Sequence, residues 1–195
     1  MSTEEGHFPI RSLIYVTTGV HAQPIDIPSP DLMAVRIRVE DRMILVISVF
    51  VPPVDVNALS LAIDLIKSAV RRHGQGHELI IAGDFNRHDQ LWGGDEVDSS
   101  VRQGEAAAII EMMDDLDLQS LLPRGTKTYE GRAGESTIDL ILATAELVAS
   151  RVMCQPYQTE HRSDHLAIST TFALKVETST SLQPRRVFKK RTGNG

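Results

Sequence analysis

The sequence predicts an α/β fold, and three neighbouring patterns in the first half of the chain carry that prediction. Leu32–Val39 alternates polar and apolar side chains, and the apolar run Met43–Val51 follows after a turn, which together predict an antiparallel hairpin. Apolar residues between Val56 and Val70 recur at helical spacing, so this segment predicts an amphipathic helix. A short apolar run, Leu79–Ala82, then predicts a buried strand. This strand–helix–strand order is typical of α/β proteins.

Before the hairpin, the sequence predicts a flexible end, one strand and one loop. Residues 1–10 are acidic and are expected to be a flexible amino terminus, separate from the domain over residues 11–174. Arg11–Val16 predicts a strand. Thr17–Pro30 is rich in Pro, Gly and polar residues, which predicts a loop in which His21 is solvated.

Beyond the hairpin, helix-capping signals and further strands complete the predicted domain. Asp55 is the N-cap candidate of the first helix, and Gly74 is its C-cap candidate. Ser100–Gln103 resembles a capping box before a second amphipathic helix, Ala106–Leu116. The remaining predicted elements are a loop at Leu118–Tyr129, a turn at Gly131–Gly134, and strands at Thr137–Ala143, within Glu146–Tyr157 and at Leu166–Leu174.

The charge distribution does not by itself indicate a nucleic-acid-binding protein. The chain of 195 residues is long enough for one domain with a real core, and its formal net charge is −6. Residues 175–195 hold six basic residues and one acidic residue, which leaves about −11 on the rest of the chain. A body of that charge repels phosphate unless a metal ion or local cations offset it. The Ser, Thr and Pro content of residues 175–195 predicts a disordered basic tail.

Cysteine content and hydropathy indicate an intracellular protein. The single cysteine, Cys154, excludes an internal disulfide and suits a reducing compartment, and we expect it to be a small buried residue. Residues 1–11 lack the apolar core of a signal peptide. The longest apolar run, Met43–Val51, is too short to span a bilayer. We therefore expect a nuclear or cytoplasmic protein that is neither secreted nor inserted in a membrane.

Polar side chains directly follow the strand Leu79–Ala82. Gly83 allows a sharp turn, and Asp84 and Asn86 come next. In an extended segment, residues two apart point to the same side, so both side chains are expected to project from the carboxyl end of the strand, where open α/β sheets place ligand sites. Asp84 could take a proton from water while Asn86 holds that water. The alternative interpretation is a turn stabilised by Asx side chains.

Two later stretches favour the interpretation as a site. Asp139 lies inside the apolar strand Thr137–Leu142, and a buried carboxylate is costly unless it is paired. His165, in Ser163-Asp164-His165, is the natural partner because it immediately precedes another strand. We therefore predict that three separated polar sites converge on one pocket.

These three motifs, in this order, resemble the endonuclease/exonuclease/phosphatase superfamily, which includes deoxyribonuclease-I-like and apurinic-endonuclease-like enzymes. The stretch Asn86–Gly94 is more specifically similar to the endonuclease domains of non-LTR, LINE-type retrotransposons. The resemblance spans Arg11–Leu174. It implies part of a four-layer α/β sandwich, with two mostly antiparallel sheets flanked by helices.

The resemblance also implies a metal-dependent site that cleaves phosphodiesters in DNA. Asp84 would activate the attacking water, and Asn86 would hold that water or a phosphate oxygen. His165 would face the scissile phosphate, and Asp139 would fix its tautomer and raise its pKa. Asp164 would bind Mg²⁺, or Mn²⁺, directly or through water.

Three more residues are candidates for binding substrate. Phe50 stands where the family has a Tyr, so it keeps the ring and lacks the hydroxyl that would touch phosphate. His88 either contacts phosphate or has a structural role. Trp92 either stacks on a base or anchors its loop to the core.

The sequence also departs from the family pattern. The family's first strands, which carry an Asn and a metal-binding Glu, have no counterpart here, and Arg185–Lys190 resembles the start of a linker to a reverse transcriptase. We therefore expect a retrotransposon-derived remnant that begins inside the domain and has weak or no nuclease activity. Three functions remain open: a Mg²⁺-dependent DNA endonuclease, a phosphatase or RNase of the same fold, and an inactive protein that only binds a partner or is inert.

Overall fold

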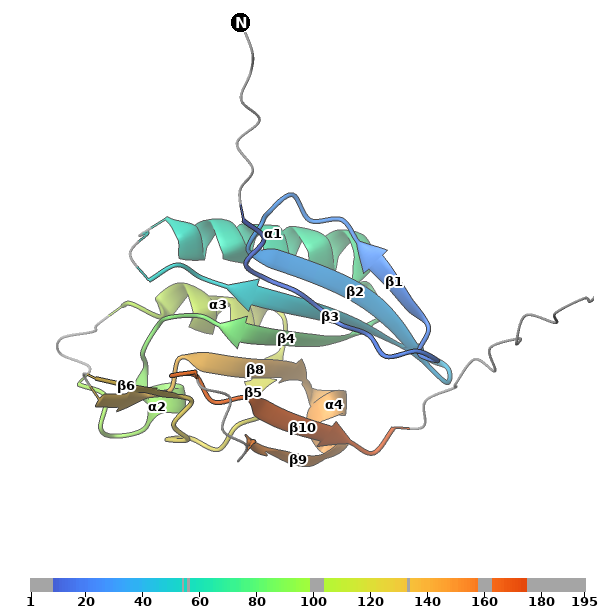
Figure 1. Cartoon of the computed structure of the whole chain (residues 1–195). Coiled ribbons are helices and arrows are strands. Elements are labelled where there is room, and N and C mark those ends of the chain that lie inside the picture. Colours follow the sequence, from blue (N-terminus) through green and yellow to red (C-terminus); the bar gives the residue numbers. More distant parts are fainter. Residues whose placement is uncertain are drawn as a thin grey trace, which may run out of the picture.

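A six-stranded mixed sheet forms the centre of the computed structural model, which describes residues 9–53, 55, 57–98, 104–132, 134–157 and 163–174 (Figure 1). Its strands, in spatial order, are β1 (Ala22–Ile25), β2 (Leu32–Val39), β3 (Arg42–Phe50), β4 (Glu78–Asp84), β8 (Asp139–Thr144) and β5 (Leu118–Ser120). The helices are α1 (Ala58–His73), α2 (Gln90–Gly93), α3 (Ala107–Asp115) and α4 (Ala145–Ala149). Two small antiparallel sheets pair β6 (Tyr129–Gly131) with β7 (Gly134–Ser136), and β9 (Arg151–Pro156) with β10 (Ile168–Phe172).

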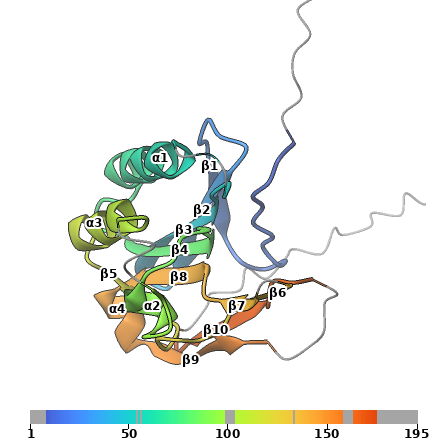
Figure 2. The ribbon, with the colours of Figure 1, turned by 90° about the vertical axis from the view of Figure 1, so that its left-hand side faces the viewer.

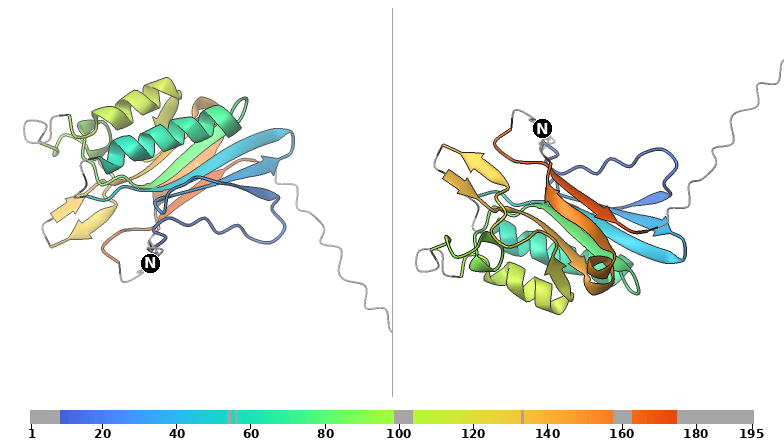
Figure 3. Two further views of the ribbon diagram at one scale, coloured as in Figure 1. Left: turned by 90° about the horizontal axis from the view of Figure 1, so that it is seen from above. Right: turned by 90° about the horizontal axis from the view of Figure 1, so that it is seen from below.

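The two faces of the main sheet carry different layers. Helices α1 and α3 cover one face, where their apolar stripes meet Leu45, Ile47 and Ile81 of the sheet (Figure 2). Strands β9 and β10 pack with α4 against the other face, around Ile141 and Leu147 (Figure 3). The α/β prediction is confirmed, as is the antiparallel hairpin of β2 and β3.

The register of the sheet brings polar residues into one row. Strands β3 and β4 are parallel with Phe50 opposite Asp84, and β4 and β8 are antiparallel with Asp84 opposite Asp139. Because residues opposite each other point to the same side of a sheet, these three side chains share one face. Ile80 and Ala82, which precede Asp84 by four and two residues, pack toward the β9–β10 side. Asp84 therefore points to the face that α1 and α3 leave open.

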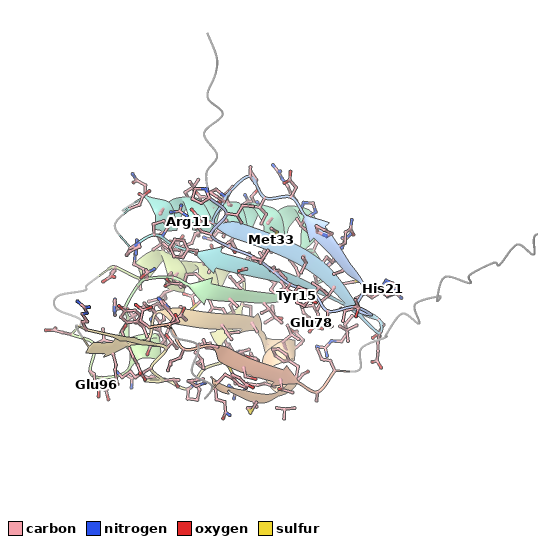
Figure 4. The ribbon with its side chains drawn as sticks, in the orientation of Figure 1. Arg11, Tyr15, His21, Met33, Glu78 and Glu96 are labelled. Atoms are coloured by element: carbon pink, nitrogen blue, oxygen red, sulfur yellow. The ribbon has the colours of Figure 1, made fainter. Side chains whose placement is uncertain are left out.

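The predicted strand Arg11–Val16 is wrong. This segment is not part of a strand, although the backbone N–H groups of Arg11 and Ser12 donate to the carbonyl of Pro30. The Ser12 hydroxyl donates to the Ser48 hydroxyl over a distance of 2.8 Å, so the segment lies across the face that α1 and α3 leave open. Tyr15 is 86% exposed in this segment (Figure 4). The pairing strand is instead β1, within the segment predicted to be a loop, because its backbone bonds to β2.

Other differences concern element ends and short elements. Strand β5 lies within the segment Leu118–Tyr129, which was predicted to be a loop. The strand was not predicted because three residues are too few to show a period of two. Helix α1 begins one residue after Asn57, and the Asp55 carboxylate accepts hydrogen bonds from the N–H groups of Asn57 and Ala58. Gly74 caps the other end as predicted, and Cys154 is buried. The predictions for residues 1–8, for the capping box and for the basic tail lie outside the described residues.

Candidate active site

Asp84 and Asn86 form a tight turn in which their side chains touch. The Asn86 N–H donates to Asp84 Oδ1 at 2.9 Å, and Asn86 Nδ2 donates to Asp84 Oδ2 at 2.6 Å. Asn86 has a positive φ of 50°, so the expected extended geometry is wrong, although the expected closeness is present. The Asx-stabilised turn and the candidate site, which were alternative interpretations of the sequence, are therefore formed by the same residues. Gly83 is needed before it, because a Cβ there would lie 1.9 Å from the carbonyl oxygen of Val49.

In the side-chain amide of Asn86, the nitrogen is fully hydrogen-bonded and the oxygen is available to bind a ligand. Its nitrogen also donates to the carbonyl oxygen of Val51 at 3.0 Å, so both amide hydrogens have partners. Both partners are pure acceptors, which fixes the orientation of the amide group. Only Oδ1 of Asn86 remains, and it can accept a hydrogen bond from water or bind a cation. Of its two predicted roles, this geometry favours holding water over donating to a phosphate oxygen.

His165 lies between two carboxylates. Its Nδ1 is 3.0 Å from Asp139 Oδ2, and its Nε2 is 4.0 Å from Asp84 Oδ2. The predicted contact between Asp139 and His165 is therefore present. Strand β6 holds the histidine in place, since the backbone of Tyr129 pairs with it and the two rings meet edge to face at 5.0 Å.

Thr128 supports the same cluster, and sequence reasoning missed it. Its side chain is fully buried, and its hydroxyl oxygen accepts from the N–H groups of Ile138 and Asp139 at 3.1 and 3.0 Å. The carbonyl of Thr128 also accepts from the N–H of Leu166, next to the histidine. The burial of Thr128 reveals its role in supporting the cluster. The sequence gives no signal of this burial, because Thr128 lies in a segment without hydrophobic periodicity.

Burial and mutual charge shift the pKa values of all three groups. Burial, with a further contribution from the charge of Asp139, raises the pKa of Asp84 to about 6. Burial likewise raises the pKa of Asp139. Burial alone would lower the pKa of His165, but its hydrogen bond and attraction to Asp139 outweigh this effect and raise it. Asp84 can thus act as a base near neutral pH, while His165 tends to carry a positive charge.

The cluster can hold a divalent cation. One ligand atom from each of Asp84, Asp139 and His165 lies within 4.8 Å of the other two. Carboxylate oxygens suit Mg²⁺ and Mn²⁺, and an imidazole nitrogen suits Mn²⁺ better than Mg²⁺. Asp164, the predicted metal ligand, is exposed and is not a member of this group of three. Its backbone carbonyl accepts instead from the N–H of Glu130.

Comparison with known proteins identifies the family. Residues 44–169 match the sequence profile of the endonuclease-reverse transcriptase family. The chain belongs to this family. The resemblance inferred from the three sequence motifs is thereby confirmed. None of the curated proteins matches the chain.

Solved structures of endonuclease/exonuclease/phosphatase proteins share the fold. The endonuclease domain of TRAS1, a telomere-specific non-LTR retrotransposon, superposes with a TM-score of 0.65 at 20% identity, over 78% of this chain and 69% of that one. The AP endonuclease LMAP from Leishmania major gives 0.63 at 14% identity, over 78% and 61%. The 3′ phosphatase NExo from Neisseria, bound to a product DNA hairpin, gives 0.57 at 19% identity, over 78% and 70%.

In this chain, a cleft of about 460 Å³ adjoins the cluster. Tyr129, which touches His165, lines it, and so does His88 from the loop after β4. Glu96 and Lys127, whose side chains pair at 2.6 Å, also line it. Nδ1 of His88 is 3.5 Å from the carboxylate of Glu105, so this residue both lines the cleft and has a structural partner.

The other two candidates for substrate binding differ in their positions. Trp92 is 2% exposed, and its Nε1 donates to the carbonyl of Arg87 at 3.2 Å. An indole ring this deeply buried cannot stack on a base. Of the two predicted roles of Trp92, base stacking is therefore wrong, and the residue anchors its loop to the core. Phe50 is half-buried beside Asp84 in the sheet, with the guanidinium of Arg11 5.3 Å from its ring centre.

No helix among the described residues is both long enough and apolar enough to cross a membrane.

Proposed function

We propose that this chain hydrolyses phosphodiester bonds in DNA with the help of Mg²⁺ or Mn²⁺, producing nicks. The observation that carries the proposal is the cluster of Asp84, Asp139 and His165 at the end of β4 and the start of β8, where two carboxylates and an imidazole meet within 4.8 Å. Two of the solved structures with this fold are named as endonucleases, which supports cleavage of a nucleic acid backbone.

Each residue has a task that follows from its contacts. Asp84, whose pKa of about 6 lies close to neutrality, takes a proton from the attacking water. Asn86 Oδ1 accepts the other hydrogen of that water and orients it. His165, held by Asp139, directs Nε2 toward the phosphate and offsets the charge that develops on its oxygens. A divalent cation held by the carboxylates of the cluster would supply further charge relief on the phosphate.

A nicking assay with alternative substrates tests the proposal. Purified chain is incubated with supercoiled plasmid, with a 3′-phosphorylated oligonucleotide and with single-stranded RNA, each with Mg²⁺, Mn²⁺ or EDTA. We expect nicked circles with metal, none with EDTA, and none from His165→Ala, whereas His21→Ala, at an exposed histidine outside the cluster, should behave like the wild type. Release of phosphate without nicking would favour a phosphatase, the activity named for the Neisseria relative. No cleavage with any substrate would favour the inactive alternative.

A further inference from the structure

Arg87 carries a charge that the proposed chemistry does not use. The residue is 7% exposed, and within the described part of the chain its guanidinium meets no carboxylate. A buried cation without a counter-charge is costly unless polar groups surround it. The groups that do so are two main-chain carbonyls: Nη1 donates to Asn86 O at 2.9 Å and Nη2 to Asp55 O at 3.5 Å.

The two carbonyls belong to the turn at Asn86 and to the segment just before α1. The first is the carbonyl of Asn86, the residue with positive φ. Because the guanidinium binds this carbonyl, it fixes the peptide plane between Asn86 and Arg87. The second belongs to Asp55, whose carboxylate accepts from the first N–H groups of α1. On the other side, the carbonyl of Arg87 accepts from the buried ring of Trp92. Arg87 therefore braces the turn against α1 and the core.

We propose that Arg87 is a positioning residue that holds the turn of Asn86 in its reactive geometry. With the peptide plane fixed, the amide of Asn86 keeps its hydrogens on Asp84 and Val51 and leaves Oδ1 toward the attacking water. Removing the brace frees the peptide plane to rotate, and the amide then loses this orientation. The inference rests on the proposed hydrolysis for its effect on rate, but the orientation of the amide can be observed without activity.

Two substitutions separate positioning from simple packing. Arg87→Met keeps an unbranched apolar side chain in place of the first part of the arginine and removes the buried guanidinium, so we expect a Tm within about 5 °C of wild type. Arg87→Lys keeps a charge but lacks the planar fork that reaches two carbonyls. Arg71→Met is the matched control, because Arg71 is an exposed arginine in the last turn of α1.

Two readouts apply to each variant. In ¹H–¹⁵N spectra, the side-chain NH₂ group of Asn86 should shift and exchange faster in Arg87→Met and Arg87→Lys, and should stay unchanged in Arg71→Met. In the nicking assay, both Arg87 variants should lose about 10- to 100-fold in kcat with KM nearly constant, because misplaced catalytic groups slow the step after binding.

The outcomes distinguish the brace from the proposed function. An unchanged Asn86 amide signal in Arg87→Met would overturn the brace even if nicking is present. An equal change in Arg71→Met would overturn it as well. If the wild-type chain does not nick, the proposed function fails, while the amide signal still tests the brace. If Arg87→Met does not fold, Arg87→Lys decides, and an unchanged amide signal there overturns the inference.

Discussion

At the scale of single residues, the ionised carboxylate of Asp84 costs stability, and the proposed function uses this carboxylate as a base. Its carboxylate is largely buried and lies beside the charge of Asp139, and both effects raise its pKa to about 6. The two hydrogen bonds from Asn86 lower the pKa only in part. A group of this kind is useful as a base near neutral pH, but its ionisation works against folding.

We predict that Asp84→Asn is inactive yet more stable than wild type at neutral pH. Because the folded pKa of Asp84 lies above the unfolded value, its contribution to stability is fully present below pH 3.8 and is lost as the pH rises through about 6. That loss amounts to about 3 kcal/mol at most. Asparagine can accept only one of the two hydrogen bonds, so the net gain should be about 1–2 kcal/mol at pH 7.

Urea unfolding at several pH values measures this gain. The advantage of Asp84→Asn should be absent at pH 4, grow up to pH 6 and then stay constant. Asp114→Asn, at an exposed carboxylate of α3, should differ little from wild type at any of these pH values. An advantage of Asp84→Asn that is equally large at pH 4 would show that burial of the charge is not its cause.

The sequence predicted the residues of the cluster better than their local geometry. The cost of burying Asp139 in an apolar strand implied a partner, and the contact with His165 is present in the structure. The left-handed turn at Asn86 could not be predicted, because its conformation depends on the carbonyl of Val51, which lies just after β3 and 35 residues away in sequence. Exposure of Asp164 was missed for a similar reason: its neighbours come from β6, 34 residues earlier in the case of Glu130.

At the scale of elements, hydrogen bonds at the start of β6 connect the segment that contains His165 to β8. Thr128, just before β6, accepts two backbone N–H groups at the start of β8, and its own carbonyl accepts from Leu166. Sequence analysis predicted a loop up to Tyr129 and a turn after it, and assigned neither a role in the site. Pairings between segments so far apart depend on three-dimensional contacts, which spacing along the chain does not show.

We predict that Thr128→Val destabilises the protein by about 2–3 kcal/mol, because two buried N–H groups lose their acceptor. Thr128→Ser keeps the hydroxyl and should cost less. In Thr128→Val the carboxylate of Asp139 should also shift away from His165, so the pKa of that imidazole, followed by NMR, should fall toward its ordinary value. A valine variant with unchanged stability and an unchanged imidazole pKa would contradict this role.

The loop around α2 owes its position to one aromatic anchor. Because Trp92 is buried and its indole donates to Arg87, Trp92→Ala should cost about 3–5 kcal/mol of unfolding free energy. Its neighbour Leu91 is exposed, and Leu91→Ala should change stability by no more than about 0.5 kcal/mol. Chemical denaturation compares the two. Trp92→Ala with wild-type stability and weakened DNA binding would restore the base-stacking interpretation.

At the scale of the whole molecule, one face of the main sheet holds most of the core, and the proposed site lies on the other face. Helices α1 and α3 cover one face (Figures 2 and 3). The side chains of Asp84 and Asp139, at the ends of β4 and β8, point to the other face. The predicted strand at residues 11–16 failed at this scale. Its aliphatic and aromatic residues suit a strand, but among the described residues no neighbouring strand pairs with it, and Leu13 and Tyr15 face solvent.

The central claim is that Asp84, Asp139 and His165 form one phosphodiesterase site, in which Asp139 and His165 act as one unit. The direct measurement is the metal-dependent rate of plasmid nicking by wild type, Asp139→Asn, His165→Ala and the double variant. We predict a slow wild-type rate that needs millimolar Mg²⁺ or Mn²⁺, because the cluster offers few carboxylate ligands. Each single variant should lose about 100-fold or more, and the double variant no more than the worse single one. The claim is contradicted if the rate losses of the two single variants multiply in the double variant. It is also contradicted if either single variant nicks plasmid at the wild-type rate.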